Sequence, residues 1–212
     1  MLKLFKYLVL AALLPLLIIV GIYGFSEYKL KAVTLPPDFD FALSIDEQTI
    51  QHGEHVLRTR GCFGCHGQQL QGRVFTDQWP WVDRAVAPNL VAYAKINGIS
   101  IFERALRHGI GADGRAFWSM PSYNFTRLSD GDVGAIFSYL RAAELIEKSL
   151  PTPNLGLKAR WKIATGADPH MADLAKEVPV LNVNPDKFPE LARGEYIAMT
   201  SCNECHGLDL RG

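Results

Sequence analysis

Residues 62–66 read Cys-Phe-Gly-Cys-His, and residues 202–206 read Cys-Asn-Glu-Cys-His. These are two copies of the pattern C-x-x-C-H, and together they contain all four cysteines of the chain. Covalent attachment of a c-type haem (heme c) uses this spacing, because two thiols add to the vinyl groups and the next imidazole ligates the iron. The pattern predicts six cofactor-binding residues, with the two histidines as iron ligands: Cys62, Cys65, His66, Cys202, Cys205 and His206.

A haem iron that carries electrons needs a second axial ligand, and a thioether in that position raises the reduction potential. Met120 lies in a loop between two expected helices, and Pro121 after it keeps that loop extended. We therefore expect Met120 to ligate the first iron, with His108 as the alternative. The other methionines precede the apolar N-terminal segment, lie in a proline-rich stretch, or come three residues before the second motif: Met1, Met171 and Met199.

An iron-ligating histidine usually donates a hydrogen bond from its other ring nitrogen, which fixes the orientation of the ring. Pro88 is followed by Asn89 and Leu90, and its carbonyl is a candidate acceptor for His66. We expect the remaining histidines to lie at the surface: His52, His55 and His170.

The N-terminal residues predict a membrane anchor. Tyr7 to Ser26 is a run of 20 residues without a charge, preceded by Lys3 and Lys6. A helix of that length spans about 30 Å, the thickness of the hydrocarbon core of a bilayer. A cleavable signal peptide is the alternative, but the apolar run is long and no Ala-x-Ala-like site follows it. Because c-type haem is attached on the outer face of the bacterial inner membrane, we expect a single pass with the C-terminal part in the periplasm.

Charge gives little information about partners. The chain has 22 basic and 22 acidic residues among 212, so nothing in the composition indicates binding to nucleic acid.

The chain divides into five expected segments: an anchor at 1–26, a stalk at 27–43, a first haem domain at 44–148, a proline-rich connector at 149–192, and the start of a second haem domain at 193–212. Capping boxes predict helix starts at Ser44–Glu47 and Ser100–Glu103, and a third helix begins after Ser129. Gly109 suits the end of the second helix. These helices predict an all-α domain around one cofactor, although the glycine-rich loops allow a short hairpin.

The connector contains six of the twelve prolines, and we expect it to be extended, without long helices. Beyond it, residues 193–212 repeat residues 53–72 at an offset of 140. Few residues follow His206, so we expect the second haem pocket to be completed by residues beyond this sequence, or else by another chain. The sequence thus predicts two haems, one of them with a full pocket here.

Several stretches of the first domain resemble class I cytochrome c: residues 62–66, 87–90, 111–115, 120–123 and 128–133. With the anchor and the second motif, the chain is similar to membrane-anchored multihaem cytochromes c. The resemblance implies that Pro88 supplies the carbonyl to the proximal histidine. It also implies redox partner proteins, namely a dehydrogenase as electron donor and a cytochrome or oxidase as acceptor.

The leading hypothesis is a membrane-bound electron carrier that makes and breaks no substrate bonds. A dihaem peroxidase-like enzyme with an open sixth position on the second iron is the alternative. A zinc site made of the four cysteines, or structural disulfides, would also use C-x-x-C pairs, but neither explains a histidine after both pairs. We expect the large aromatic residues near the first site to pack in its interior or to shield the haem edge: Trp79, Trp81 and Trp118.

Overall fold

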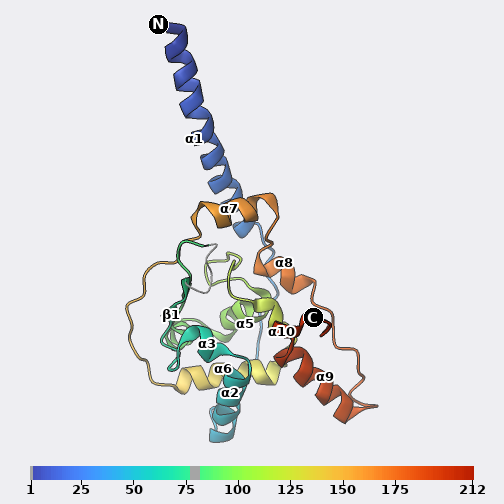
Figure 1. Cartoon of the computed structure of the whole chain (residues 1–212). Helices are drawn as coiled ribbons and strands as arrows, with labels where there is room; N and C mark the ends of the chain where they lie inside the picture. Colours follow the sequence, from blue (N-terminus) through green and yellow to red (C-terminus); the bar gives the residue numbers. More distant parts are fainter. Residues whose placement is uncertain (1, 77–81) are drawn as a thin grey trace.

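The computed structural model describes residues 2–76 and 82–212, and the side chains of that part except those at positions 2–5, 8–10 and 12. Figure 1 shows one long helix projecting from a rounded domain built from shorter helices. In chain order the elements are α1 (Leu2–Lys31), α2 (Glu47–Thr59), α3 (Cys62–His66), β1 (Arg73–Val74), β2 (Val86–Ala87), α4 (Leu90–Ile96), α5 (Ile99–His108), the 3-10 turn η2 (Ser122–Asn124), α6 (Asp130–Ala142), α7 (Gly156–Thr165), α8 (Met171–Lys176), α9 (Pro189–Ser201) and α10 (Asn203–His206).

The first domain is helical, and its only sheet among the described residues is the two-stranded antiparallel pair of β1 and β2. Its main core lies between α2, α4, α5 and α6. The helices α2 and α6 pack closely where they cross, because a Cβ at Gly53 would lie 2.0 Å from the carbonyl oxygen of Ala135. This glycine therefore sets the spacing of the two helices that support the first motif.

A second core lies nearer to the long helix. It joins the end of α1 to the β-pair, the loop at 110–116 and α7, through residues that include Leu30, Ala116 and Ile163. Leu30 and Ser26 are fully buried, so α1 enters the domain instead of stopping above it. The stalk expected at 27–43 is not a separate spacer. Helix α1 continues to Lys31, and the chain after it lies against α5 and α6.

The contacts of that chain segment explain why it does not extend freely. The backbone N–H of Phe39 donates to the Ser100 hydroxyl (3.1 Å), and the Phe39 ring packs against the main core. A Cβ at Gly134 would lie 2.2 Å from the Phe41 ring, so that ring sits directly on α6.

Helix boundaries agree with the predictions in some places and not in others. Ser129 caps α6 by accepting a hydrogen bond from the Asp132 N–H (3.1 Å), and Gly109 ends α5 with φ of 64°, as predicted. Both predicted capping boxes are wrong. Asp46 caps α2 by accepting from Thr49 N–H (2.9 Å), and α5 already begins at Ile99, so that Ser100 lies inside it.

The connector is not extended throughout, which corrects the sequence-based expectation. It contains α7 and α8, because its prolines flank these helices and none lies inside them. Pro189 lies in the first turn of α9, where the missing N–H costs nothing. His170 is also not at the surface: it is buried at the start of α8, where its ring accepts from the Asp173 N–H (3.3 Å).

Candidate haem site

The first motif begins with a reversal of the chain after α2. Gly61 has φ of 73° and precedes α3, and Gly67 ends α3 with φ of 85°. Non-glycine residues rarely adopt such angles, so the two glycines let a single helical turn carry the whole motif. On this turn Cys62 is half-buried against the main core and Cys65 is exposed.

The histidine of this motif is held by the residue that the sequence indicated. His66 is only 5% exposed, and its Nδ1 lies 2.8 Å from the carbonyl oxygen of Pro88. Burial lowers the pKa of the His66 imidazole, so it is neutral near pH 7, although the hydrogen bond to Pro88 acts the other way. A neutral imidazole with Nδ1 bound leaves Nε2 for a metal.

Pro88 is itself fixed on both sides. The strand pair of β1 and β2 ends just before it, and Asn89 after it caps α4 by accepting from Ala92 N–H (2.9 Å). Asn89 also donates to the Ile146 carbonyl (2.9 Å), and Leu90 N–H donates to the Leu70 carbonyl (2.9 Å). These bonds join the acceptor carbonyl to the loop that follows the motif.

Met120 packs, partly buried, against the same main core as Cys62. The turn after it is anchored because Ser122, which is fully buried, donates from its hydroxyl to the Ala105 carbonyl (3.0 Å). The loop between α5 and α6 therefore brings a thioether to the core that also supports the first motif.

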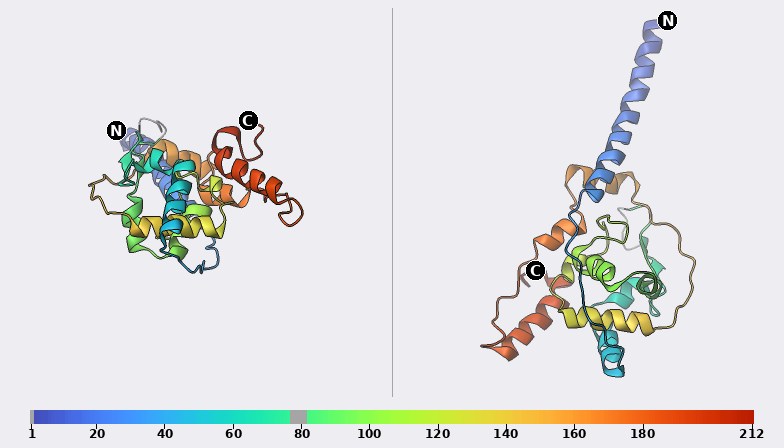
Figure 2. Two further views of the ribbon diagram at one scale, coloured as in Figure 1. Left: turned by 90° about the horizontal axis from the view of Figure 1, so that it is seen from below. Right: turned by 180° about the vertical axis from the view of Figure 1, so that it is seen from behind.

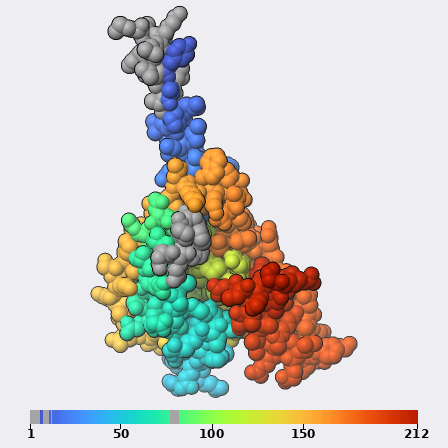
Figure 3. All heavy atoms as spheres, viewed as in Figure 1, coloured from blue at the N-terminus to red at the C-terminus, as the bar shows by residue number. Residues whose placement is uncertain are grey.

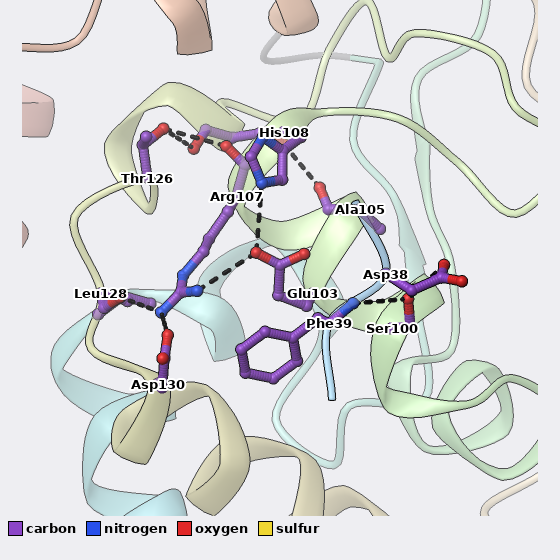
Figure 4. A network of polar contacts seen from close by, with 11 residues as sticks. Asp38, Phe39, Ser100, Glu103, Ala105, Arg107, His108, Thr126, Leu128 and Asp130 are labelled. Atoms are coloured by element: carbon purple, nitrogen blue, oxygen red, sulfur yellow. Dashed lines mark hydrogen bonds and ion pairs between the residues drawn. The ribbon is translucent and has the colours of Figure 1, made fainter. Parts of the chain in front are cut away.

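His108, the alternative ligand, is engaged elsewhere. Figure 4 shows it in a polar network on α5, where its Nε2 lies 3.3 Å from Glu103 Oε1. Arg107 joins the same carboxylate to Asp130 at the start of α6, at 3.3 and 2.7 Å. This network ties α5 to α6, so the geometry favours Met120 over His108 as a ligand.

The two thiols fit a site for covalent attachment better than the competing interpretations. Both are free, and burial raises the pKa of the Cys62 thiol to about 12. A redox-active dithiol needs a lowered thiol pKa, and a zinc thiolate site needs its ligands gathered together. Among the residues that the structure describes, no group of three His, Cys, Asp or Glu side chains is arranged to hold a metal ion. The donor set of thiols, neutral imidazole and thioether fits a c-type haem.

The second motif repeats the backbone of the first, as the sequence repeat suggested. After α10, Gly207 and Leu210 have φ of 78° and 60°, and their counterparts Gly67 and Leu70 have 85° and 56°. The closing hydrogen bond is also shared: the glycine at position 72 or 212 donates to the carbonyl of the motif histidine, at 2.7 and 2.8 Å. Cys202, Cys205 and His206 are arranged on one turn like their counterparts. Cys202 and His206 are more exposed than Cys62 and His66, and Cys205 is exposed like Cys65.

The two motifs lie side by side, which the sequence did not indicate. In Figure 3 the C-terminal segment rests directly on the first domain. A cavity of about 200 Å³ lies between them, bordered by Arg60 and Gly61 on one side and Ser201 and Glu204 on the other. Arg60 donates to the Ser201 hydroxyl (2.6 Å), which connects the two segments directly.

Further polar contacts hold the second segment in place. The buried Asn203 side chain donates to the Asn124 carbonyl (3.3 Å) and lies 3.2 Å from its Oδ1. The Tyr196 hydroxyl on α9 donates to Asp132 and accepts from Ser129 N–H (3.1 Å). Asn203 is a variable position of C-x-x-C-H, so no motif rule points to this role.

The sequence also predicted where two further histidines and three tryptophans lie. His52 and His55 are exposed, as expected, and His52 pairs with Asp132 (2.6 Å). Trp118 packs against the second core, near the end of α1, and not against the main core. Trp79 and Trp81 lie outside the described residues.

With this geometry in place, comparison with known proteins gives a consistent result. Residues 48–140 match the family model described as cytochrome c oxidase, cbb3-type, subunit III. That stretch includes the first motif, Pro88 and Met120. Residues 48–140 therefore form a cytochrome c domain, and the predicted all-α cytochrome c fold is confirmed.

Relatives extend the match over more of the chain. The chain is 29% identical, over 180 residues, to the cytochrome c subunit of the alcohol dehydrogenase (quinone) of Gluconobacter oxydans, which covers 78% of this chain and 36% of that protein. It is 25% identical to the corresponding subunit of Gluconacetobacter polyoxogenes, covering 86% and 40%. It is 26% identical to the fructose dehydrogenase cytochrome subunit of Gluconobacter japonicus, covering 77% and 35%.

This sequence thus spans 35–40% of the length of these relatives. Their names describe cytochrome subunits, which agrees with the prediction of an electron carrier rather than a catalytic enzyme. The chain is thus similar to cytochrome c subunits over most of its length.

Proposed function

We propose that the first domain binds one haem through Cys62 and Cys65, and that His66 and Met120 would hold its iron. The observation that carries this proposal is the buried His66, whose Nδ1 lies 2.8 Å from the Pro88 carbonyl oxygen. When bound, the haem supplies a one-electron Fe(III)/Fe(II) couple. The Pro88 carbonyl would fix the imidazole, the Met120 thioether would favour the reduced iron, and the main core would exclude water.

We also propose that Cys202, Cys205 and His206 bind a second haem, so that the chain is a relay. Electron transfer between two centres needs them close together and rigidly placed. The bonds from Arg60 to Ser201 and from Asn203 to Asn124 hold the two motifs side by side. The similarity of their backbones supports the same mode of attachment at both.

The place of the chain in the cell is part of the proposal. Among the described residues one helix is long and apolar enough to cross a membrane, over Leu13–Lys31. We propose that α1 anchors the chain in the bacterial inner membrane and that the haem domains face the periplasm. The donor would be a dehydrogenase at the same membrane, because the names of the relatives describe subunits of dehydrogenases, and the acceptor would be a cytochrome or an oxidase.

Optical spectra and redox titration of the haem-loaded chain test this proposal. We expect low-spin spectra and fully reversible one-electron steps. A five-coordinate, high-spin iron that turns over peroxide would contradict the carrier and favour the peroxidase-like alternative instead.

A further inference from the structure

The helix α7 carries two large apolar side chains that are only half-buried on its outer face. Its inner face is buried through Gly156, Ala159 and Ile163. One turn apart on the outer face lie Leu157 and Trp161, which are 44% and 53% exposed. A large aromatic and a leucine exposed together on a short helix indicate contact with something outside the domain.

The position of α7 relative to α1 indicates which surface its outer face contacts. Figures 1 and 2 show α7 lying across the end of α1, on the side of the domain from which α1 projects. Figure 3 shows the same helix forming the surface of the domain around the base of α1.

Arg160 fixes the height of α7 along α1. Its guanidinium lies over the Tyr23 ring (4.5 Å to the centroid) and donates to the Ser26 hydroxyl (3.0 Å) and to Glu27 (2.9 Å). Arg115 from the first domain also pairs with Glu27 (3.0 Å). The helix α7 is therefore clamped at the level where the uncharged run of α1 ends.

The side chains at this level are those that membrane interfaces favour. Tyr23, Phe25 and Tyr28 are exposed around the end of α1, and aromatic rings prefer the depth of the lipid headgroups. On α7, Lys158 is exposed beside Leu157 and Trp161. A helix with apolar and cationic side chains on its outer face suits a surface of apolar chains and anionic phosphates.

We propose that α7 lies in the plane of the phospholipid surface, with Leu157 and Trp161 among the upper acyl chains and Lys158 at the lipid phosphates. This inference rests on the proposed anchoring by α1. Together α1 and α7 would attach the domain at two points, so that the first motif has a fixed height and orientation above the bilayer. A single spanning helix followed by a stalk would leave both free.

The test uses the full-length, haem-loaded chain in phospholipid nanodiscs. Cysteines introduced by Trp161→Cys and Leu157→Cys would be labelled with a nitroxide, and collision with dissolved oxygen or with a water-soluble nickel chelate would be measured by electron paramagnetic resonance. The parent chain, treated with the same label, shows whether its own cysteines react. Leu16→Cys, in the middle of α1, and Ile45→Cys, at the far end of the domain, are the matched controls; both parent side chains are exposed.

We expect nitroxides at 157 and 161 to collide more often with oxygen than with the chelate. The nitroxide at 16 should behave in the same way, and the nitroxide at 45 should not. A label at 161 that the chelate reaches freely, while the label at 16 stays in lipid, would overturn the role of α7 and leave the anchor intact. A label at 16 that the chelate reaches would overturn the anchor itself. Protection of the label at 161 from both reagents would mean that protein covers this face, which also contradicts lipid contact.

Discussion

At the scale of single residues, the chemistry of the first site could be predicted because it depends on order along the chain. The motif places Cys62, Cys65 and His66 on one helical turn. The proline that precedes asparagine and leucine, Pro88, places its carbonyl opposite the ring of His66. The structure puts that carbonyl 2.8 Å from His66 Nδ1. The role of Asn203 could not be predicted, since its hydrogen-bond partner, Asn124, is distant in sequence and is brought to it only by the fold.

The distal ligand gives the sharpest prediction at this scale. Met120→Ala should leave the first iron five-coordinate and high-spin, and Met120→His should restore a low-spin state at a lower potential. A fall on the order of 0.2 V is expected, within the range of about 0.8 V that axial ligands span. Potentiometric titration followed in the visible spectrum measures both.

Met199→Ala is the matched control, because Met199 is on α9 beside the second motif and near Arg127. If this variant loses the low-spin signal of the first haem and Met120→Ala keeps it, the assignment of the distal ligand is wrong.

At the scale of elements, helix ends were predicted where one residue decides them and missed where several compete. Ser129 has no acidic neighbour before it and caps α6 as expected. Before α2, Ser44 and Asp46 compete, and the carboxylate caps the helix while Ser44 donates to it. In the connector, proline content was a poor guide, because the spacing of prolines matters more than their number.

Asn89 joins α4 to the acceptor of the proximal histidine, so its cap affects both stability and the site. Asn89→Ala removes the bonds to Ala92 N–H and the Ile146 carbonyl and should cost about 1–2 kcal/mol of unfolding free energy. Denaturant unfolding of the haem-loaded protein measures this loss. Asn89→Asp retains the cap, and it should recover part of the stability; equal loss in both variants would show that the cap contributes nothing.

The cap of α2 predicts a dependence on pH. Hydrogen bonds from Ser44 and from the Thr49 N–H lower the pKa of Asp46 from 3.8 to about 2. Because the folded pKa is the lower one, the stabilisation is complete above about pH 4 and is lost as the pH falls through 2. Asp46→Asn still caps but does not titrate, so the denaturation midpoint of this variant should fall less between pH 4 and pH 2. Parallel curves for the two proteins would contradict the prediction.

At the scale of the whole molecule, the sequence shows that there are two motifs but does not predict how they lie relative to each other in space. The repeat at an offset of 140 showed that both turns would be alike. Their placement side by side depends on contacts between residues far apart, such as Arg60 with Ser201 and Tyr196 with Asp132. The burial of the end of α1 was missed for the same reason, since Glu27 finds its partners in Arg115 and Arg160.

Tyr196 tests how firmly the second segment is held. Tyr196→Phe removes the hydroxyl bonds to Asp132 and Ser129 N–H, worth about 1 kcal/mol, and should make transient release of α9 about fivefold more frequent. Cleavage of the connector by a dilute protease should accelerate by the same factor. Glu190→Gln, at the exposed start of α9, is the control and should have no effect. An unchanged cleavage rate in Tyr196→Phe would mean that other contacts hold the segment.

The central claim is that a haem is covalently bound at the first motif. Intact-mass spectrometry of the chain, produced in a host that matures c-type cytochromes, tests it most directly. We predict that the chain has gained the mass of two haems, and that the Cys62→Ala/Cys65→Ala double variant has gained only one. A chain with the mass of the bare polypeptide, or a double variant with the same gain as the parent, would contradict the account.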